Sequence, residues 1–160
     1  MKQILSKIQA QSLDKIASKD FHIQGRELMG NAGKKIASII EKEFFKKKSK
    51  SVLIICGKGN NGGDGFSTAL ELKNKSVNIH IHSLYDKKKY IGDSKYFLDL
   101  CLANKIPITF GINIEDINYF NYSIVVDAIL GIGFRGPIKA DLIHWINFIN
   151  KSKSTVISID

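Results

Sequence analysis

Residues 52–72 decide the fold of this 160-residue chain, and they read VLIICGKGNNGGDGFSTALEL. The first five residues are apolar without interruption, which is typical of a strand buried on both faces of a parallel sheet. From Phe66 onward the apolar residues recur at helical spacing. The pattern therefore predicts a strand at 52–56, a glycine-rich turn at 57–65 and then a helix, whose first N–H groups favour bound anions.

The turn itself carries more oxygen atoms than an ordinary dinucleotide site needs. Its glycines 57, 59 and 62 match G-x-G-x-x-G, which is a weak signal alone. Asn60, Asn61 and Asp64 crowd the same turn, and a carboxylate beside a pyrophosphate is repelled unless something compensates for it. Two interpretations stay open: Asp64 caps the helix, or the amide and carboxylate oxygens hold a hard cation next to a ligand.

Length and composition indicate one domain with a proper core. The 24 Lys and Arg against 15 Asp and Glu give a net charge of +9, which suits either an anionic partner or a solvated lysine-rich surface. Cys56 and Cys101 have no C-x-x-C spacing, so a reducing, cytoplasmic compartment is expected. Neither a signal peptide nor an apolar run long enough for a membrane span is recognised, so no membrane association is expected.

The rest of the chain alternates predicted helices with predicted strands. An N-terminal apolar face, on one helix or two, is expected to pack on the core, and a second helix is expected at 25–48. Further strands are predicted at 77–83, 106–110, 124–128 and 155–159, with helices near 96–104 and 142–149 and a short helix or turn at 115–121. This order predicts a mostly parallel sheet with helices on both faces.

Two local patterns have a structural and a functional interpretation. The small residues Gly30, Ala32 and Gly33 interrupt the second helix early, and close helix packing explains them better than a ligand contact. His80 and His82 share one face of the strand at 77–83, where simple alternation explains them better than metal binding.

Polar groups follow three of the predicted strands. Asn60, Asn61 and Asp64 follow the first, Asp127 ends a later one and Asp160 ends the last. Because the carboxyl ends of parallel strands share one edge of the sheet, these groups are expected to converge there.

The chain resembles the NAD(P)H-hydrate epimerase family, also called the YjeF N-terminal domain. The resemblance covers nearly the whole chain and depends on four motifs: ELMGNAG at 27–33, GKGNNGGDG at 57–65, VDAILGIGFRGP at 126–137 and ISID at 157–160. It implies a Rossmann-like three-layer αβα sandwich and an isomerase that interconverts the R and S forms of hydrated NADH and NADPH, a nicotinamide cofactor repair reaction.

The resemblance also implies roles for residues that match the motifs. Asn61 and Asp127 would be ligands of a bound potassium ion, and Asp160, followed by Asp64, would be the candidate for general acid and base. The hydrated dinucleotide would be bound by Asn60, Asn61, Gly62, Gly63, Asp64, Gly131, Ile132, Gly133, Phe134, Arg135, Gly136, Pro137 and Asp160.

Two departures from the family pattern stand out. Gly30 occupies a position where the family usually has Glu. Family members continue past the final aspartate with Ile-Pro-Ser-Gly, so residues 1–160 are expected to be a YjeF N-terminal-like domain truncated at its C-terminal end. The family also implies a fused or separate ADP- or ATP-dependent hydrate dehydratase as partner, and a possible homodimer.

Two other functions compete with the epimerase. A non-catalytic binding module on the same fold, with an RNA or protein partner, would suit the positive charge, but its oxygen-rich loop would be expected to be lost, so nucleic acid is not the expected partner. An NAD-dependent dehydrogenase would need an acidic residue at the end of the second strand, where His82, Ser83 and Leu84 stand.

Overall fold

The computed structural model describes residues 5–45, 51–75, 77–112 and 122–159. These residues form, in chain order, α1 (Lys7–Asp20), α2 (Gly25–Phe44), β1 (Ser51–Cys56), α3 (Asn60–Lys73), β2 (Asn78–Ser83), the 3-10 turn η1 (Lys87–Lys89), α4 (Gly92–Ala103), β3 (Ile108–Phe110), β4 (Ile124–Ala128), α5 (Ala140–Lys151) and β5 (Thr155–Ser158). The short helix or turn predicted at 115–121 lies outside the described residues.

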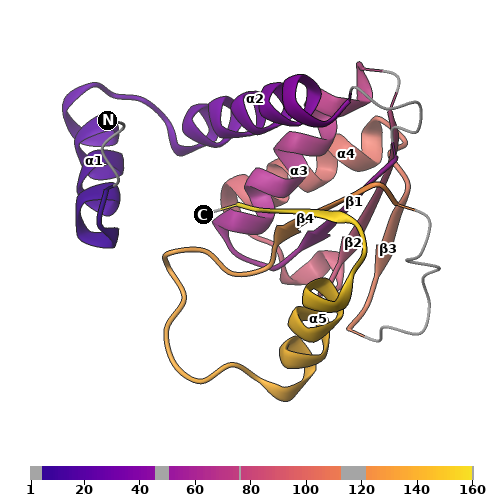
Figure 1. Ribbon diagram of the computed structural model, residues 1–160. Helices are drawn as coiled ribbons and strands as arrows, with labels where there is room; N and C mark the ends of the chain where they lie inside the picture. The colour runs from indigo at the N-terminus through magenta and orange to yellow at the C-terminus, as the bar shows by residue number, and fades with distance from the viewer. Residues whose placement is uncertain (1–4, 46–50, 76, 113–121, 160) are drawn as a thin grey trace.

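The five strands form one parallel sheet in the order β3-β2-β1-β4-β5 (Figure 1). Strand β1 is central and fully buried, as its uninterrupted apolar sequence predicts. The strand order reverses between β1 and β4, which is the place where open α/β sheets leave a crevice for ligands. The predicted α/β fold with a parallel central sheet is confirmed.

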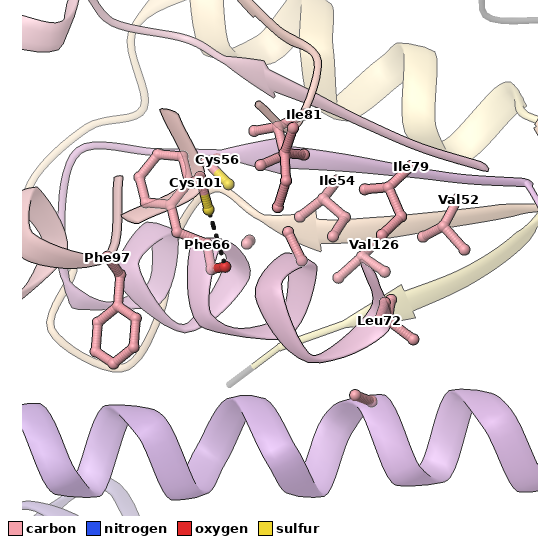
Figure 2. Close-up of a cluster of buried hydrophobic side chains, with 14 of the residues drawn as sticks. Val52, Ile54, Cys56, Phe66, Leu72, Ile79, Ile81, Phe97, Cys101 and Val126 are labelled. Carbon is pink, nitrogen blue, oxygen red and sulfur yellow. Dashed lines mark hydrogen bonds between the residues drawn. The ribbon is translucent and has the colours of Figure 1, made fainter. Parts of the chain in front are cut away.

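The sheet separates two hydrophobic cores, each covered by helices (Figure 1). On one face, alternate residues of β1 such as Ile54 pack with α3 and α4, and α2 lies outside α3 (Figure 2). On the other face Leu53 and Ile55 pack with α5, whose Trp145 is completely buried. Because helices cover both faces of the sheet, the fold is a three-layer αβα sandwich. The carboxyl ends of the strands are where a ligand site is expected.

Helix α1 does not pack on the core, so that expectation is wrong. It is one unbroken helix, started by a capping box between Ser6 and Gln9, and it lies apart from the sandwich (Figure 1). Its apolar residues stay open to solvent: Ile8 is 77% exposed and Leu13 is 50% exposed. The helical periodicity identified the helix correctly, because spacing reports an apolar face and not what covers that face.

Among the described residues, none of the helices combines the length and apolar character needed to span a bilayer.

Candidate functional site

The turn between β1 and α3 is made of glycines because the backbone passes close to itself there. A Cβ atom on Gly62 would lie 1.8 Å from the carbonyl oxygen of Gly57, and one on Gly57 would lie 2.0 Å from the carbonyl oxygen of Ile129. Both obstacles are backbone atoms, which cannot swing aside as a flexible side chain can. The Gly57 amide also donates to the Ala128 carbonyl at 2.9 Å, which joins this turn to the end of β4.

Helix α3 begins at Asn60, inside the segment predicted as turn. Its N-cap is Gly59, which has no side chain to accept from the first amides, and the first intrahelical bond runs from the Gly63 amide to the Gly59 carbonyl. The amides before that bond carry the positive end of the helix dipole and have no intrahelical partner. Asp64 lies within the helix, so the alternative that it is the cap is wrong.

Asn61 combines burial with an unused hydrogen-bond donor. The residue is 9% exposed, and its Nδ2 has no hydrogen-bond partner among the described residues. Leaving such a group unpartnered costs roughly 1–3 kcal/mol, so a ligand, ion or water is expected to complete it. A Cβ placed on Gly131 would lie 3.2 Å from Asn61 Cγ. The Asn61 amide group therefore lies between the start of α3 and the loop that follows β4.

Asp127 is the second polar group at this edge of the sheet. It pairs in register with Ile55, one residue before the end of β1. Its Oδ1 accepts from the Ile129 amide at 3.1 Å, and its Oδ2 accepts from the Ser158 hydroxyl at 3.5 Å. Burial raises the pKa of Asp127 above its ordinary value, and these two hydrogen bonds oppose the rise. The structure thus holds a carboxylate where a free negative charge is disfavoured.

Asn61 and Asp127 lie on two neighbouring segments at the carboxyl edge of the sheet. Strands β1 and β4 are neighbours, and the turn after β1 touches the loop after β4 at Gly57 and at Asn61. Amide and carboxylate oxygens are the donors that alkali and alkaline-earth ions prefer. A cation here would also offset the cost of a half-buried charge on Asp127. The predicted convergence of the first and fourth strand ends is what the fold produces.

The β4–α5 loop, residues 129–139, is open. Its Phe134 amide donates to the Gly131 carbonyl at 3.0 Å, which makes a tight turn, and the side chain of Arg135 is exposed. A Cβ placed on Gly133 or Gly136 would meet nothing within 4 Å. Gly136 has a φ of +90°, which explains why this position is glycine. The remaining predicted binding residues of this loop are half-buried or exposed: Ile132, Phe134 and Pro137.

Asp160 lies outside the described residues. The preceding residue is held at the same edge of the sheet, since the Ile159 amide donates to the Asp127 carbonyl at 2.9 Å. The structure therefore brings Asn61 beside Gly131 and places the ends of β1 and β4 next to each other. Asn60 and Asp64 lie in the first turns of the same helix as Asn61. The structure gives no position for the first candidate acid and base.

Comparison with known proteins connects this arrangement to a family. The family model described as "YjeF-related protein N-terminus" matches residues 25–160. The chain belongs to this family.

Curated relatives agree with the YjeF N-terminal assignment. An NAD(P)H-hydrate epimerase of Plasmodium knowlesi is 36% identical over 98% of the chain and 53% of its own length. The NAD(P)H-hydrate epimerase of Oenococcus oeni is 31% identical over 98% of the chain and 72% of its own length. A bifunctional NAD(P)H-hydrate repair enzyme, Nnr, of Moorella thermoacetica is 33% identical over 92% of the chain and 29% of its own length. The chain thus spans about half the length of the Plasmodium relative and under a third of the Moorella relative.

A solved structure supports the fold independently. The crystal structure of yeast YNL200c superposes with a TM-score of 0.85 at 23% identity, covering 99% of this chain and 70% of the yeast chain. At that identity the likeness concerns the fold alone, and it confirms the Rossmann-like αβα sandwich.

One part of the site was missed at the sequence level. A cavity of about 290 Å³ lies beside Asn60 and Asp64, and its other walls are Ser18, Gly25, Leu28, Met29 and Ala32. The sequence signal is the helical spacing of residues 25, 28 and 32, two of which belong to the YjeF motif at 27–33. For Ala32 the sequence favours close helix packing, so the cavity was not expected at this position.

The small residues of that motif divide into two roles. Gly33 serves close packing, because a Cβ there would lie 2.2 Å from the Ser67 hydroxyl of α3, and for this residue the packing interpretation is confirmed. Ala32 lines the cavity, so packing does not account for it. Gly30 has only an ordinary contact, 3.7 Å from a Phe97 ring atom to a Cβ placed there, so close packing does not require glycine.

The two histidines of β2 form a hydrogen-bonded chain with the edge strand β3. His80 Nε2 lies 3.1 Å and His82 Nδ1 lies 2.8 Å from the Thr109 hydroxyl, and His82 Nε2 donates to the Gly111 carbonyl at 2.9 Å. The His82 ring also stacks on Trp145, with 4.4 Å between ring centroids. These hydrogen bonds and the ring stacking give both histidines a structural role in joining β2 to β3 and to α5.

Proposed function

We propose that this protein is an NAD(P)H-hydrate epimerase that interconverts the R and S forms of hydrated NADH or NADPH. The observation that carries the proposal is the buried, unpartnered amide of Asn61, which lies between the free start of α3 and the β4–α5 loop. The relatives named NAD(P)H-hydrate epimerase support the same activity. Those names do not favour the non-catalytic RNA or protein-binding module.

The substrate carries negatively charged phosphates and a hydrated nicotinamide ring, and the site has groups that can bind both. The amides at the start of α3 and the exposed Arg135 provide positive potential for the phosphates. Gly133 and Gly136 leave the loop backbone accessible, so the loop can close around the phosphates with Gly131, Ile132, Phe134 and Pro137. Asn60, Asn61, Gly62, Gly63 and Asp64 bind the remainder of the hydrated dinucleotide.

Epimerisation requires a proton carrier at the hydroxylated carbon. In one route a carboxyl group gives its proton to the hydroxyl, the C–O bond breaks and water leaves, while the ring nitrogen lone pair stabilises the cation. Water then adds to the other face and returns a proton to the carboxylate. In the other route the ring opens to an aldehyde and recloses. Asp160 is the first candidate for the carrier and Asp64 the second.

Potassium is part of the proposal. Asn61 and Asp127 would hold it, and it would supply positive charge between the Asp127 carboxylate and the ligand phosphates. The oxygen donors of both side chains suit such an ion, and a cation would offset the cost of burying the Asp127 carboxylate, the burial that raises its pKa. We also propose that the epimerase works with a dehydratase for the same hydrate, fused or separate, as the relatives named bifunctional suggest. A homodimer and a cytoplasmic location stay predictions.

The test starts from the pure R form of hydrated NADH. Formation of the S form, followed by chromatography, is expected to exceed the rate in protein-free buffer and to fall when sodium replaces potassium. Asp160→Asn and Asp64→Asn are each compared with Asp99→Asn, a matched change at an exposed carboxylate on α4 that pairs with Lys95. A wild-type protein that does not exceed the protein-free rate would remove the proposed function.

A further inference from the structure

The cavity beside Asp64 has a wall that is fixed before any ligand arrives. Gly25, Leu28 and Ala32 recur every three to four residues, so they form one stripe on α2. Met29 is held in place by α3, because a Cβ on Gly63 would lie 2.5 Å from its sulfur. The close approach of Gly33 to Ser67 brings the same two helices together one turn further along. The cavity is therefore part of the packed structure.

The charge of the cavity excludes the phosphate half of the proposed substrate. The seven lining residues include one carboxylate, Asp64, and no lysine or arginine. A phosphate in this space would be repelled by Asp64 and would desolvate itself against Leu28 and Met29. Basic groups stand instead on the two turns at the carboxyl edge of the sheet: Arg135 is exposed, and the Lys58 ammonium lies 5.7 Å from the centre of the Tyr85 ring.

The size and lining of the cavity match the nicotinamide half of the substrate. At about 290 Å³ the cavity is at the lower limit of ligand pockets, which run from roughly 300 to 1,000 Å³, so it suits a single ring and not a whole dinucleotide. Leu28, Met29 and Ala32 give an apolar wall, and Asn60 supplies an amide that can pair with another amide.

We propose that this cavity between α1, α2 and the start of α3 is the subsite for the hydrated nicotinamide ring, an inference that rests on the proposed function. The apolar stripe of α2 packs on the ring, Asn60 hydrogen-bonds its carboxamide and Asp64 faces its hydroxylated carbon. Ser18 of α1 completes the wall. Ala32 is then the residue that sets the space available to the ring.

The test compares a ligand that has the ring with one that lacks it. Ala32→Leu fills the cavity, and Lys34→Leu places the same side chain at an exposed position on the other side of α2. Calorimetric titration with hydrated NADH is expected to show affinity about tenfold or more weaker for Ala32→Leu, equivalent to ~1.4 kcal/mol. ADP-ribose has the two phosphates but lacks the nicotinamide ring, and it is expected to bind both variants with the affinity it has for the wild type.

The possible results separate this inference from the activity. Equal weakening of both ligands in Ala32→Leu, or no weakening of either, would overturn the subsite even if the wild type epimerises. Selective loss of hydrated NADH affinity would support the subsite even if no epimerisation is found. A wild type that binds hydrated NADH no better than ADP-ribose also overturns it. If Ala32→Leu does not fold, as judged by its thermal transition, Ala32→Val makes the same comparison with a smaller side chain.

Discussion

In the turn between β1 and α3, Gly57 and Gly62 lie against the protein's own backbone, whereas Gly133 and Gly136 of the loop between β4 and α5 face open space. At Gly57 and Gly62 an added Cβ would meet backbone oxygens at 2.0 and 1.8 Å, and at Gly133 it would meet nothing within 4 Å. Both segments are glycine-rich at the same edge of one sheet. The difference shows that the backbone of the turn itself requires Gly57 and Gly62, while nothing in the protein requires glycine at 133.

The largest expected effect is at Gly62. Gly62→Ala places a methyl group against the Gly57 carbonyl, and backbone cannot yield without separating β1 from α3. We expect a loss of about 3 kcal/mol in the free energy of unfolding, at the upper end of overpacking effects. Urea denaturation followed by circular dichroism measures it. A loss below about 1 kcal/mol would mean that the turn is as open as the second loop.

Arg135→Ala tests whether the β4–α5 loop binds the ligand. Its side chain is exposed, so stability should change by no more than about 0.5 kcal/mol. Affinity for hydrated NADH should fall about tenfold, because a charge-assisted hydrogen bond to phosphate is worth roughly 1.5–3 kcal/mol. Lys153→Ala, which removes an exposed charge before the start of β5, is the control and should leave affinity unchanged. Equal affinity of wild type and Arg135→Ala would show that the loop does not bind the phosphates.

Asp127 lies at the end of β4, next to the turn after β1, and Asp127→Asn is expected to change the free energy of unfolding by a smaller amount. Burial raises the pKa of Asp127, so the folded protein holds a proton there more tightly than the unfolded chain. The stability this provides is complete below the ordinary value of 3.8 and is lost as pH rises through the folded-state pKa. Without potassium, Asp127→Asn should therefore be more stable than the wild type at neutral pH, with the gain disappearing toward pH 3.8.

Denaturant unfolding of both proteins across this pH range, in potassium and in sodium at equal ionic strength, measures the effect. Potassium should stabilise the wild type and leave Asp127→Asn unchanged. A variant that is less stable than the wild type at neutral pH would show that the hydrogen bonds from Ile129 and Ser158 outweigh the burial of the carboxylate.

The smallest effect should be that of Gly133→Ala on stability. Since no atom lies within 4 Å of an added Cβ, the free energy of unfolding should stay within about 0.5 kcal/mol of the wild type. The paired measurement is affinity for hydrated NADH, which should weaken if the loop backbone approaches the ligand at this glycine. A destabilised Gly133→Ala would remove the contrast between the two segments.

The strands were the most predictable part of this fold. Runs such as VLIIC at 52–56 have one environment that suits them, a sheet buried on both faces, and β1 and β4 were located to within a residue. The neighbouring ends of β1 and β4 then followed from parallel topology, because neighbouring parallel strands bring their following residues to one edge.

The start of α3 and the surroundings of α1 were not predictable from local pattern. Asn60, Asn61 and the two glycines after them are poor helix formers. The helix begins there in a tightly packed place, where Gly62 lies against the Gly57 backbone and Gly63 against Met29 and Ser94. The apolar face of α1 indicates a helix and gives no information about a partner. Ala32 was assigned to packing for a similar reason: a small residue on a helix can face either a neighbouring helix or a cavity.

The glycine turn after β1 also shows how a nucleotide fingerprint can be satisfied for internal reasons. Of the three glycines in its G-x-G-x-x-G, the outer two, Gly57 and Gly62, exclude side chains that would strike main-chain oxygen, and only Gly59 faces open space. A search for this pattern finds the right spacing, but two of its three glycines are required by the backbone of the turn whether or not a nucleotide binds.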